Sequence, residues 1–214
     1  MSMDSEFPLL NAAEVRILGC LAEKKELTPD VYPMTINGLQ SAANQKTARD
    51  PVMALEPDEI RRTLGLLEGK GLVRQTFASR VERYEHLLPQ RFSLTHPQIA
   101  ILGLLLLRGP QTARELLVRS ERLARFGSIE GLNTEIDLLI GRRPALIKLL
   151  ERGPGQREER YAHLLSGDVT VAVTSSRSAS SASPSSAVES RLQVLEEQVA
   201  MLQAQVRSLG GDGV

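Results

Sequence analysis

Two stretches of the chain repeat the same alternation of apolar and polar positions. Residues 10–19 (LNAAEVRILG) and 94–103 (LTHPQIAILG) lie 84 positions apart, and each has apolar side chains at helical spacing. In both, Asn or Thr is followed three residues later by Glu or Gln, which is typical of a capping box at a helix start. Residues 84–88 (YEHLL) and 161–165 (YAHLL) form a second pair, 77 positions apart. The pattern therefore predicts two copies of one small domain in tandem.

The first copy predicts three helices followed by a β-hairpin. Apolar spacing favours a helix over about 12–25, a second from Thr35 and a third that begins at Pro57, whose ring suits a first helical turn. Two strand-like runs, 72–77 and 81–86, follow the third helix. The second copy gives the same order, with helices over 97–108, from Thr112 and after Ser128, and strands over 145–150 and 159–163.

This order of elements is typical of a winged helix, in which the second and third helices form a helix-turn-helix and the hairpin forms the wing. A generic α+β domain is the alternative. Because the order occurs twice, we predict a mainly α fold with small β-hairpins (α+β), made of two tandem winged-helix (helix-turn-helix) domains plus a C-terminal coiled-coil helix. The predicted segments are an N-terminal lead (1–10), winged-helix domain 1 (11–91), winged-helix domain 2 (92–168), a flexible Ser/Ala-rich linker (169–187), a heptad helix (188–209) and a tail (210–214).

The heptad helix places apolar residues at alternating spacings of four and three. β-Branched residues at most a positions with Leu at d positions favour a parallel two-stranded coiled coil, so we predict a homodimer. Folding back onto the chain's own domains is the alternative for so short a helix. The predicted oligomerisation residues are Val188, Leu192, Leu195, Val199, Leu202, Val206 and Leu209.

Composition narrows the possible classes of protein. The chain has 26 basic and 26 acidic residues, whereas a sequence-blind nucleic-acid binder is usually basic. A single cysteine, Cys20, excludes a disulfide within the chain and suggests a reducing compartment. The longest apolar run, 99–107, is too short to cross a bilayer, and the N-terminus lacks the pattern of a signal peptide. We therefore expect a cytoplasmic protein with no membrane partner.

Short motifs spread over residues 10–166 resemble the YceH-like family of bacterial proteins. This resemblance implies two tandem winged helices in a cytoplasmic protein, and it implies no catalytic residues. Ala43 stands where the family pattern often has Cys, so a thiol-dependent role is not expected there. The motifs are LGCL (18–21), TPDVYP (28–33), NQK (44–46), DPVM (50–53), SRV (79–81), YEH (84–86), LRGPQT (107–112), RSER (119–122), PGQ (154–156) and YAHLL (161–165).

No residue pattern in the sequence predicts an active site. There is no phosphate-cradling glycine loop and no Cys/His cluster with zinc spacing. His86 and His163 occupy equivalent positions in the two copies, so they are predicted to do the same structural task twice. Cys20 lies in an apolar helix pattern and is predicted to be a buried small hydrophobe. We expect no enzyme activity, no cofactor, no metal and no small-molecule substrate.

Two functions remain open. The first is DNA-binding transcription regulation through the wings and the loop before the third helix, with polar residues that contact phosphates or base edges. The second is a protein-interaction adaptor of the chromosome-condensation accessory type, an analogy at the level of the fold alone. Charge on the third helix favours the second function, since Glu130, Glu135 and Asp137 have no base beside them in the second copy. The usual role of helix-turn-helix proteins favours the first, so DNA binding is the predicted function and the adaptor is the alternative. Candidate nucleic-acid contacts are Asn44, Gln45, Lys46, Arg49, Arg61, Arg62, Arg80, Arg83, Arg114, Arg119, Arg122, Arg157 and Arg160.

Overall fold

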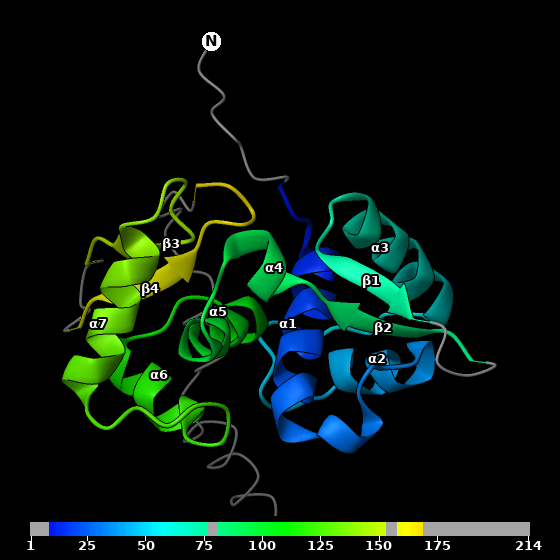
Figure 1. The fold of residues 1–214 in the computed structure, drawn as a ribbon, viewed down its shortest axis with the longest axis horizontal. Coiled ribbons are helices and arrows are strands. Elements are labelled where there is room, and N and C mark those ends of the chain that lie inside the picture. Colours follow the sequence, from blue (N-terminus) through cyan, green and yellow to red (C-terminus); the bar gives the residue numbers. More distant parts are fainter. Residues whose placement is uncertain (1–8, 77–80, 153–157, 169–214) are drawn as a thin grey trace, which may run out of the picture. The chain divides into compact units, whose positions relative to one another are not determined.

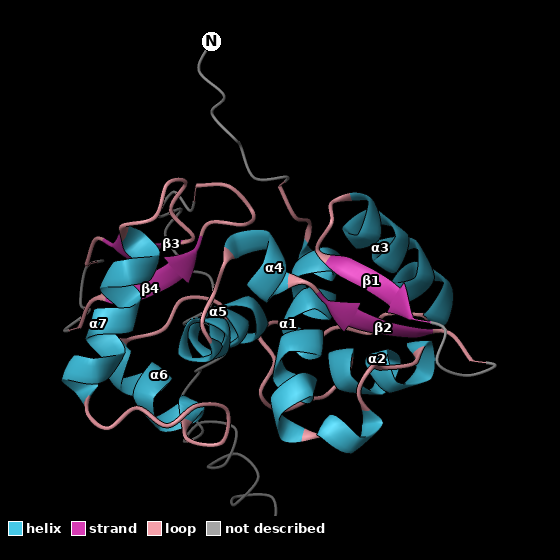
Figure 2. Cartoon of the chain, in the orientation of Figure 1, coloured by secondary structure: helices cyan, strands magenta, loops and turns pink. Residues whose placement is uncertain are grey.

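The computed structural model describes residues 9–76, 81–152 and 158–168, so the predicted linker and heptad helix lie outside the described residues. The fold is mixed α+β, with helices and two small antiparallel hairpins (Figures 1 and 2). The elements are α1 (Ala12–Leu27), the 3₁₀ turn η1 (Pro29–Val31), α2 (Ile36–Ala43), α3 (Pro57–Gly69), β1 (Val73–Thr76), β2 (Arg83–His86), α4 (Leu88–Phe92), α5 (His96–Arg108), α6 (Ala113–Ser120), α7 (Ile129–Ile140), β3 (Ile147–Leu150) and β4 (Arg160–His163). The predicted order of three helices and a hairpin is confirmed in both copies, while η1 and α4 were not predicted.

The helix starts follow from local capping. Asn11 Oδ1 accepts a hydrogen bond from Glu14 N (2.9 Å), and Glu14 Oε2 accepts one from Asn11 N (2.8 Å). In the second copy Gln98 Oε1 accepts from Thr95 N (3.2 Å). These bonds satisfy backbone donors that have no partner inside the helix. The two predicted capping boxes are therefore confirmed.

The hairpins have matching registers. Val73 of β1 lies opposite His86 of β2, and Ile147 of β3 lies opposite His163 of β4. The residue just before the cap of the second helix adds a bridge to each hairpin. Met34 and Tyr84 exchange two backbone hydrogen bonds (3.0 and 2.8 Å). The equivalent residues Gln111 and Tyr161 repeat this exchange in the second copy with the same two lengths, so each hairpin is tied to the helix pair before it.

The first helices of the two copies, α1 and α5, pack against each other (Figure 1). A Cβ added to Gly19 of α1 would lie 2.9 Å from Leu107 Cγ and 3.1 Å from Leu106 Cβ. A Cβ added to Gly103 of α5 would lie 3.4 Å from Ala22 Cβ. The glycines are 84 positions apart and so occupy equivalent places in the two copies. The missing side chains let the two helices approach closely.

The buried apolar residues of both copies form one connected cluster. It includes Leu18 and Leu39 of the first copy and Leu102 and Leu116 of the second, and all four side chains are fully buried. The α1–α5 contact joins the two halves of this cluster. The division of residues 11–168 into two domains at 91/92 stays a prediction. In the described part of the chain, no helix has both the length and the hydropathy needed to cross a bilayer.

Candidate functional site

The structure places Arg49 inside the protein, although the sequence suggested it as a surface contact. Its side chain is fully buried, and its guanidinium bonds both carboxylate oxygens of Glu23 on α1 (Nη1–Oε1 3.1 Å, Nη2–Oε2 2.5 Å). Arg49 Nε donates to the carbonyl of Ala42 at the end of α2 (2.9 Å). Glu23 neutralises this charge, so Arg49 fastens the loop after α2 onto α1.

Asn44 also serves the loop before α3. Its Oδ1 accepts from Leu55 N (2.8 Å), and its Nδ2 donates to Leu55 O (3.0 Å). Because both ends of the amide bond the same residue, the side chain is occupied within the fold. Gln45 beside it is half-buried, and Lys46 is exposed.

Three further candidate arginines hold carbonyl or amide groups of their own chain. Arg83 on β2 donates to Pro33 O (2.8 Å), and Arg160 on β4 donates to Pro110 O (3.1 Å). Since these pairs are equivalent in the two copies, the wing arginine has a repeated structural task. Arg119 on α6 donates to Gln111 Oε1 (2.7 Å) and to Glu115 Oε1 (3.2 Å).

The other described candidates lie on the surface. Lys46, Arg61, Arg62, Arg114 and Arg122 are exposed. Arg61 pairs with Asp58 on α3 (3.2 Å), which offsets its charge. Arg80 and Arg157 lie outside the described residues. The structure therefore leaves exposed cations on the loop after α2, on α3 and around α6.

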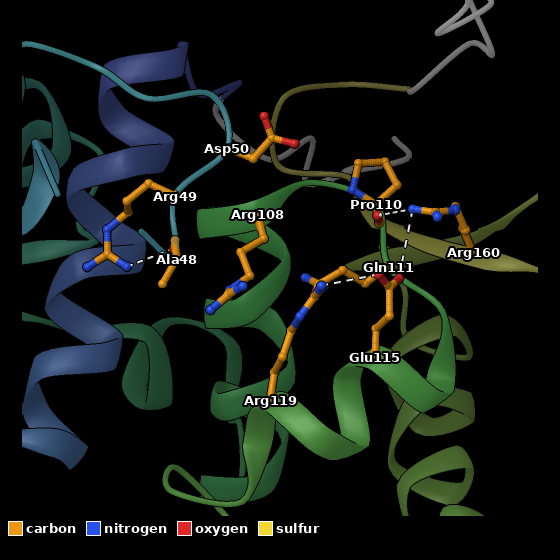
Figure 3. A pocket seen from close by; sticks show the side chains of 9 residues that line it. All are labelled: Ala48, Arg49, Asp50, Arg108, Pro110, Gln111, Glu115, Arg119 and Arg160. Carbon is orange, nitrogen blue, oxygen red and sulfur yellow. Dashed lines mark hydrogen bonds and ion pairs between the residues drawn. The ribbon is translucent and has the colours of Figure 1, made fainter. Parts of the chain in front are cut away.

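Three of the candidates, Arg49, Arg119 and Arg160, line a polar pocket between the loop after α2 and the start of α6 (Figure 3). Its volume is about 200 Å³. Sequence reasoning missed Arg108, the last residue of α5, which faces the same space (Figure 3). The sequence signal that could have identified Arg108 is its position directly after the long apolar run 99–107. The lining residues are Ala48, Arg49, Asp50, Arg108, Pro110, Gln111, Glu115, Arg119 and Arg160.

The third helices, α3 and α7, each present one exposed leucine. Leu66 of α3 is 52% exposed and Leu138 of α7 is 55% exposed. They are 72 positions apart, the same offset that relates the buried pair Leu64 and Ile136. The two leucines therefore occupy equivalent positions on the solvent side of equivalent helices.

Carboxylates accompany these leucines. Glu130 and Asp137 are exposed on α7, and no base lies on that helix. Glu135 turns inward and accepts a hydrogen bond from Gln98 of α5 (2.9 Å). On α3 the exposed charges have both signs. The surface of α7 is therefore acidic and partly apolar.

The repeated histidines are the last residues of β2 and β4, where His86 is buried and His163 is half-buried. His86 is 2% exposed, and its Nδ1 accepts from Leu88 N (3.3 Å). Burial lowers the pKa of His86 to about 3 and that of His163 to about 4, because a charged imidazole loses its hydration there. Both rings are neutral at pH 7 and act as parts of the packed interior.

Cys20 is fully buried in the core, as predicted. Burial raises the pKa of its thiol to about 11, since a thiolate would lose its hydration. A thiol with so high a pKa is a poor nucleophile at pH 7. Among residues 9–76, 81–152 and 158–168, no three His, Cys, Asp or Glu side chains are grouped so that they could hold a metal ion.

Comparison with known proteins agrees with the resemblance seen in the sequence. Residues 10–156 match the profile of a family described as "Protein of unknown function, DUF480". A UPF0502 protein of Mesorhizobium japonicum is 63% identical over 209 residues, which cover 98% of this chain and all of that protein. UPF0502 proteins of Xanthomonas campestris pv. campestris (50% over 208 residues, 94% of this chain and 93% of the relative) and Stenotrophomonas maltophilia (49% over 211 residues, 96% of each) are also similar. The chain thus belongs to the DUF480/UPF0502 family of bacterial proteins.

Proposed function

We propose that this protein is a non-enzymatic adaptor built of two winged-helix domains, which binds a partner protein through the third helices, α3 and α7. The observation that carries the proposal is the pair of exposed leucines, Leu66 and Leu138, at equivalent positions of the two helices. In the winged-helix interpretation these helices belong to the helix-turn-helix units, whose second helix is the one that docks onto DNA in DNA-binding proteins.

Charge favours a protein over a nucleic acid at α7. DNA carries a dense negative charge along its backbone, and the exposed Glu130 and Asp137 would be repelled by it. A partner with basic residues around an apolar side chain would complement the same surface. Burying a fully exposed leucine side chain contributes about 1.5–3 kcal/mol. Leu66 and Leu138 are about half exposed, so each would contribute about half of that to binding.

Four candidate arginines that already have partners within the chain also favour a protein partner over DNA. Arg49, Arg83, Arg119 and Arg160 already bond groups of their own chain. Moving any of them to a phosphate would break those bonds, which adds a cost to DNA binding. The exposed faces of α3 and α7 need no such rearrangement to bind a partner.

A photocrosslinking experiment tests the adaptor proposal. A photoreactive residue is placed at position 62 or 134 of the full chain in cells, one helical turn before Leu66 or Leu138 on an exposed side of the same helix, and crosslinked species are identified. We expect one protein partner that crosslinks from both positions and whose recovery falls at least tenfold in a Leu66→Asn/Leu138→Asn variant. The control Val118→Asn alters another exposed residue, on α6, and should leave recovery unchanged. Recovery that is the same in all three proteins would refute the proposal.

DNA binding is the second candidate, and it rests on the exposed cations. Five exposed cations on the loop after α2, on α3 and around α6 could contact phosphates: Lys46, Arg61, Arg62, Arg114 and Arg122. A titration with mixed genomic DNA at about 50 and 200 mM salt tests this function, since a protein with several phosphate contacts weakens steeply with salt. Absence of binding at the lower salt would remove this candidate.

We also propose that the chain forms a homodimer through its C-terminal heptad positions. A dimer would present two copies of α3 and α7 on one assembly, which raises avidity without any new contact. This proposal rests on the sequence pattern of residues 188–209.

A further inference from the structure

The polar pocket between the two copies contains a cation, Arg108, that has no hydrogen-bond or ion-pair partner among the described residues. Arg108 is half-buried at the end of α5. The other arginines of the pocket are engaged, Arg49 with Glu23, Arg119 with Glu115 and Gln111, and Arg160 with Pro110 O. Arg108 is therefore the distinctive group of this pocket.

The surroundings of Arg108 carry positive charge. Figure 3 shows Arg108 and Arg119 reaching toward the same space from α5 and from α6. Desolvation, followed by the nearby charge of Arg119, lowers the pKa of Arg108. Outside the Arg49–Glu23 pair, three arginines line the pocket together with two carboxylates, Asp50 and Glu115. The pocket thus has an excess of one positive charge.

The usual structural explanation for an arginine at this position is incomplete. A base in the last turn of a helix interacts favourably with the free carbonyl groups there. In α5 these carbonyls have other donors, because Gln111 Nε2 bonds Leu104 O (2.9 Å), Gly109 N bonds Leu105 O (2.9 Å) and Asp50 N bonds Leu107 O (2.9 Å). Arg108 therefore keeps its donors available for a group that enters the pocket.

We propose that this pocket binds a small phosphate-type oxyanion, either inorganic phosphate or the phosphoryl group of a small molecule, with Arg108 as its principal ligand. A guanidinium offers a planar fork of donors that matches the oxygens of a phosphate. The volume of about 200 Å³ is below the range of about 300–1,000 Å³ for drug-sized ligands, so it suits a phosphate with a small substituent. This site is separate from the third-helix surfaces, and neither proposal depends on the other.

Binding here would join the two copies. Ala48, Arg49 and Asp50 come from the first copy, whereas Arg108, Arg119 and Arg160 come from the second. An anion held between them would add an attraction across the same junction that the α1–α5 contact forms. The ligand would therefore stabilise the arrangement of the two copies.

Thermal unfolding of the full chain with added phosphate tests the proposal. Inorganic phosphate and glycerol phosphate are titrated separately, from zero to about 10 mM, at an ionic strength held constant with sodium chloride. We expect a saturable rise of about 2 °C or more in the unfolding midpoint, since a ligand that binds the native state stabilises it. A rise with both compounds would indicate recognition of the phosphoryl group, and a rise with inorganic phosphate alone would indicate the free ion. Equilibrium dialysis with the same compounds measures the affinity.

The variants separate a specific site from a general salt effect. Arg108→Gln should lose the saturable rise and bind phosphate at least tenfold more weakly, while Arg108→Lys, which keeps the charge without the fork, should lie between it and the wild type. The control Arg114→Gln removes an exposed arginine of α6 that does not line the pocket and should behave as wild type. Without phosphate, Arg108→Gln should unfold at the same temperature as wild type or higher, because it removes a partly desolvated charge that has no partner in residues 9–76, 81–152 and 158–168.

Three outcomes would overturn the proposal. The first is a wild-type protein whose midpoint does not change or rises without saturation, as expected for an excluded salt. The second is a saturable rise that persists in Arg108→Gln. The third is a loss of DNA affinity in Arg108→Gln without any phosphate effect, which would assign Arg108 to a nucleic-acid surface instead.

Discussion

The close approach of α1 and α5 at Gly19 leads to a sharp stability prediction. In Gly19→Val the new Cβ would lie 2.9 Å from Leu107 Cγ and 3.1 Å from Leu106 Cβ, and two methyl groups would add to the crowding. Overpacking of this kind typically costs about 1–3 kcal/mol. Valine is slightly better than glycine in a helix, by a few tenths of a kcal/mol. The free energy of unfolding should therefore fall by about 1–3 kcal/mol.

Gly65 supplies a matched control. It also lies within a helix, α3, but an added Cβ would meet no atom within 4 Å. Gly65→Val should therefore leave the free energy of unfolding unchanged or raise it by a few tenths of a kcal/mol. Urea unfolding followed by circular dichroism measures both variants, and a lower midpoint with an unchanged slope identifies a change in stability.

Gly19 and Gly65 should therefore differ in their response to the same substitution, although the sequence alone does not distinguish them. Equal midpoints for Gly19→Val and Gly65→Val would refute it, because the same substitution would then cost the same at a crowded and at an open position. A loss confined to Gly19→Val would support the α1–α5 contact as the joint between the two copies.

Three further predictions concern the pH dependence, the buried ion pair and the tail. Since burial holds the pKa of His86 at about 3 and of His163 at about 4, below the ordinary value of 6.5, the unfolded chain binds protons first as pH falls. The free energy of unfolding should decrease from pH 6.5 toward pH 4, by up to about 1.4 kcal/mol per pH unit for each histidine. Urea unfolding at several pH values measures this decrease, and the free energy of unfolding of His86→Asn/His163→Asn should depend less steeply on pH. Arg49→Met leaves the Glu23 carboxylate without its cation and should cost about 3–5 kcal/mol by the same assay, whereas Arg49→Met/Glu23→Gln should recover part of the loss; equal stability of the two variants would contradict the ion-pair argument. Deletion of residues 188–214 should halve the molar mass measured by light scattering, and an unchanged mass would remove the predicted coiled-coil dimer.

Local sequence patterns were sufficient to predict the three helices and the hairpin of each copy and their repetition, but not η1 or α4. The capping boxes at Asn11 and Thr95 act between residues three positions apart, so the helix starts were readable without any knowledge of the fold. Helical spacing of apolar residues gave α3, and Pro57 marked its first turn. The family resemblance came from short motifs and was confirmed by the comparisons. These features depend on residues that are close together in the sequence, so they can be predicted without the fold.

Which polar side chains remain at the surface depends on tertiary packing and could not be predicted from local patterns. Arg49 and Arg62 look alike in the sequence, yet Arg49 is buried against Glu23 of α1, 26 positions earlier, while Arg62 is exposed. The sequence predicts only that Arg108 ends a helix. Its place in the polar pocket became visible from the fold, which brings the loop at residues 48–50 beside it. A side chain's partners are set by segments distant in sequence that packing brings together. Burial then fixes which charges are neutralised and which stay available.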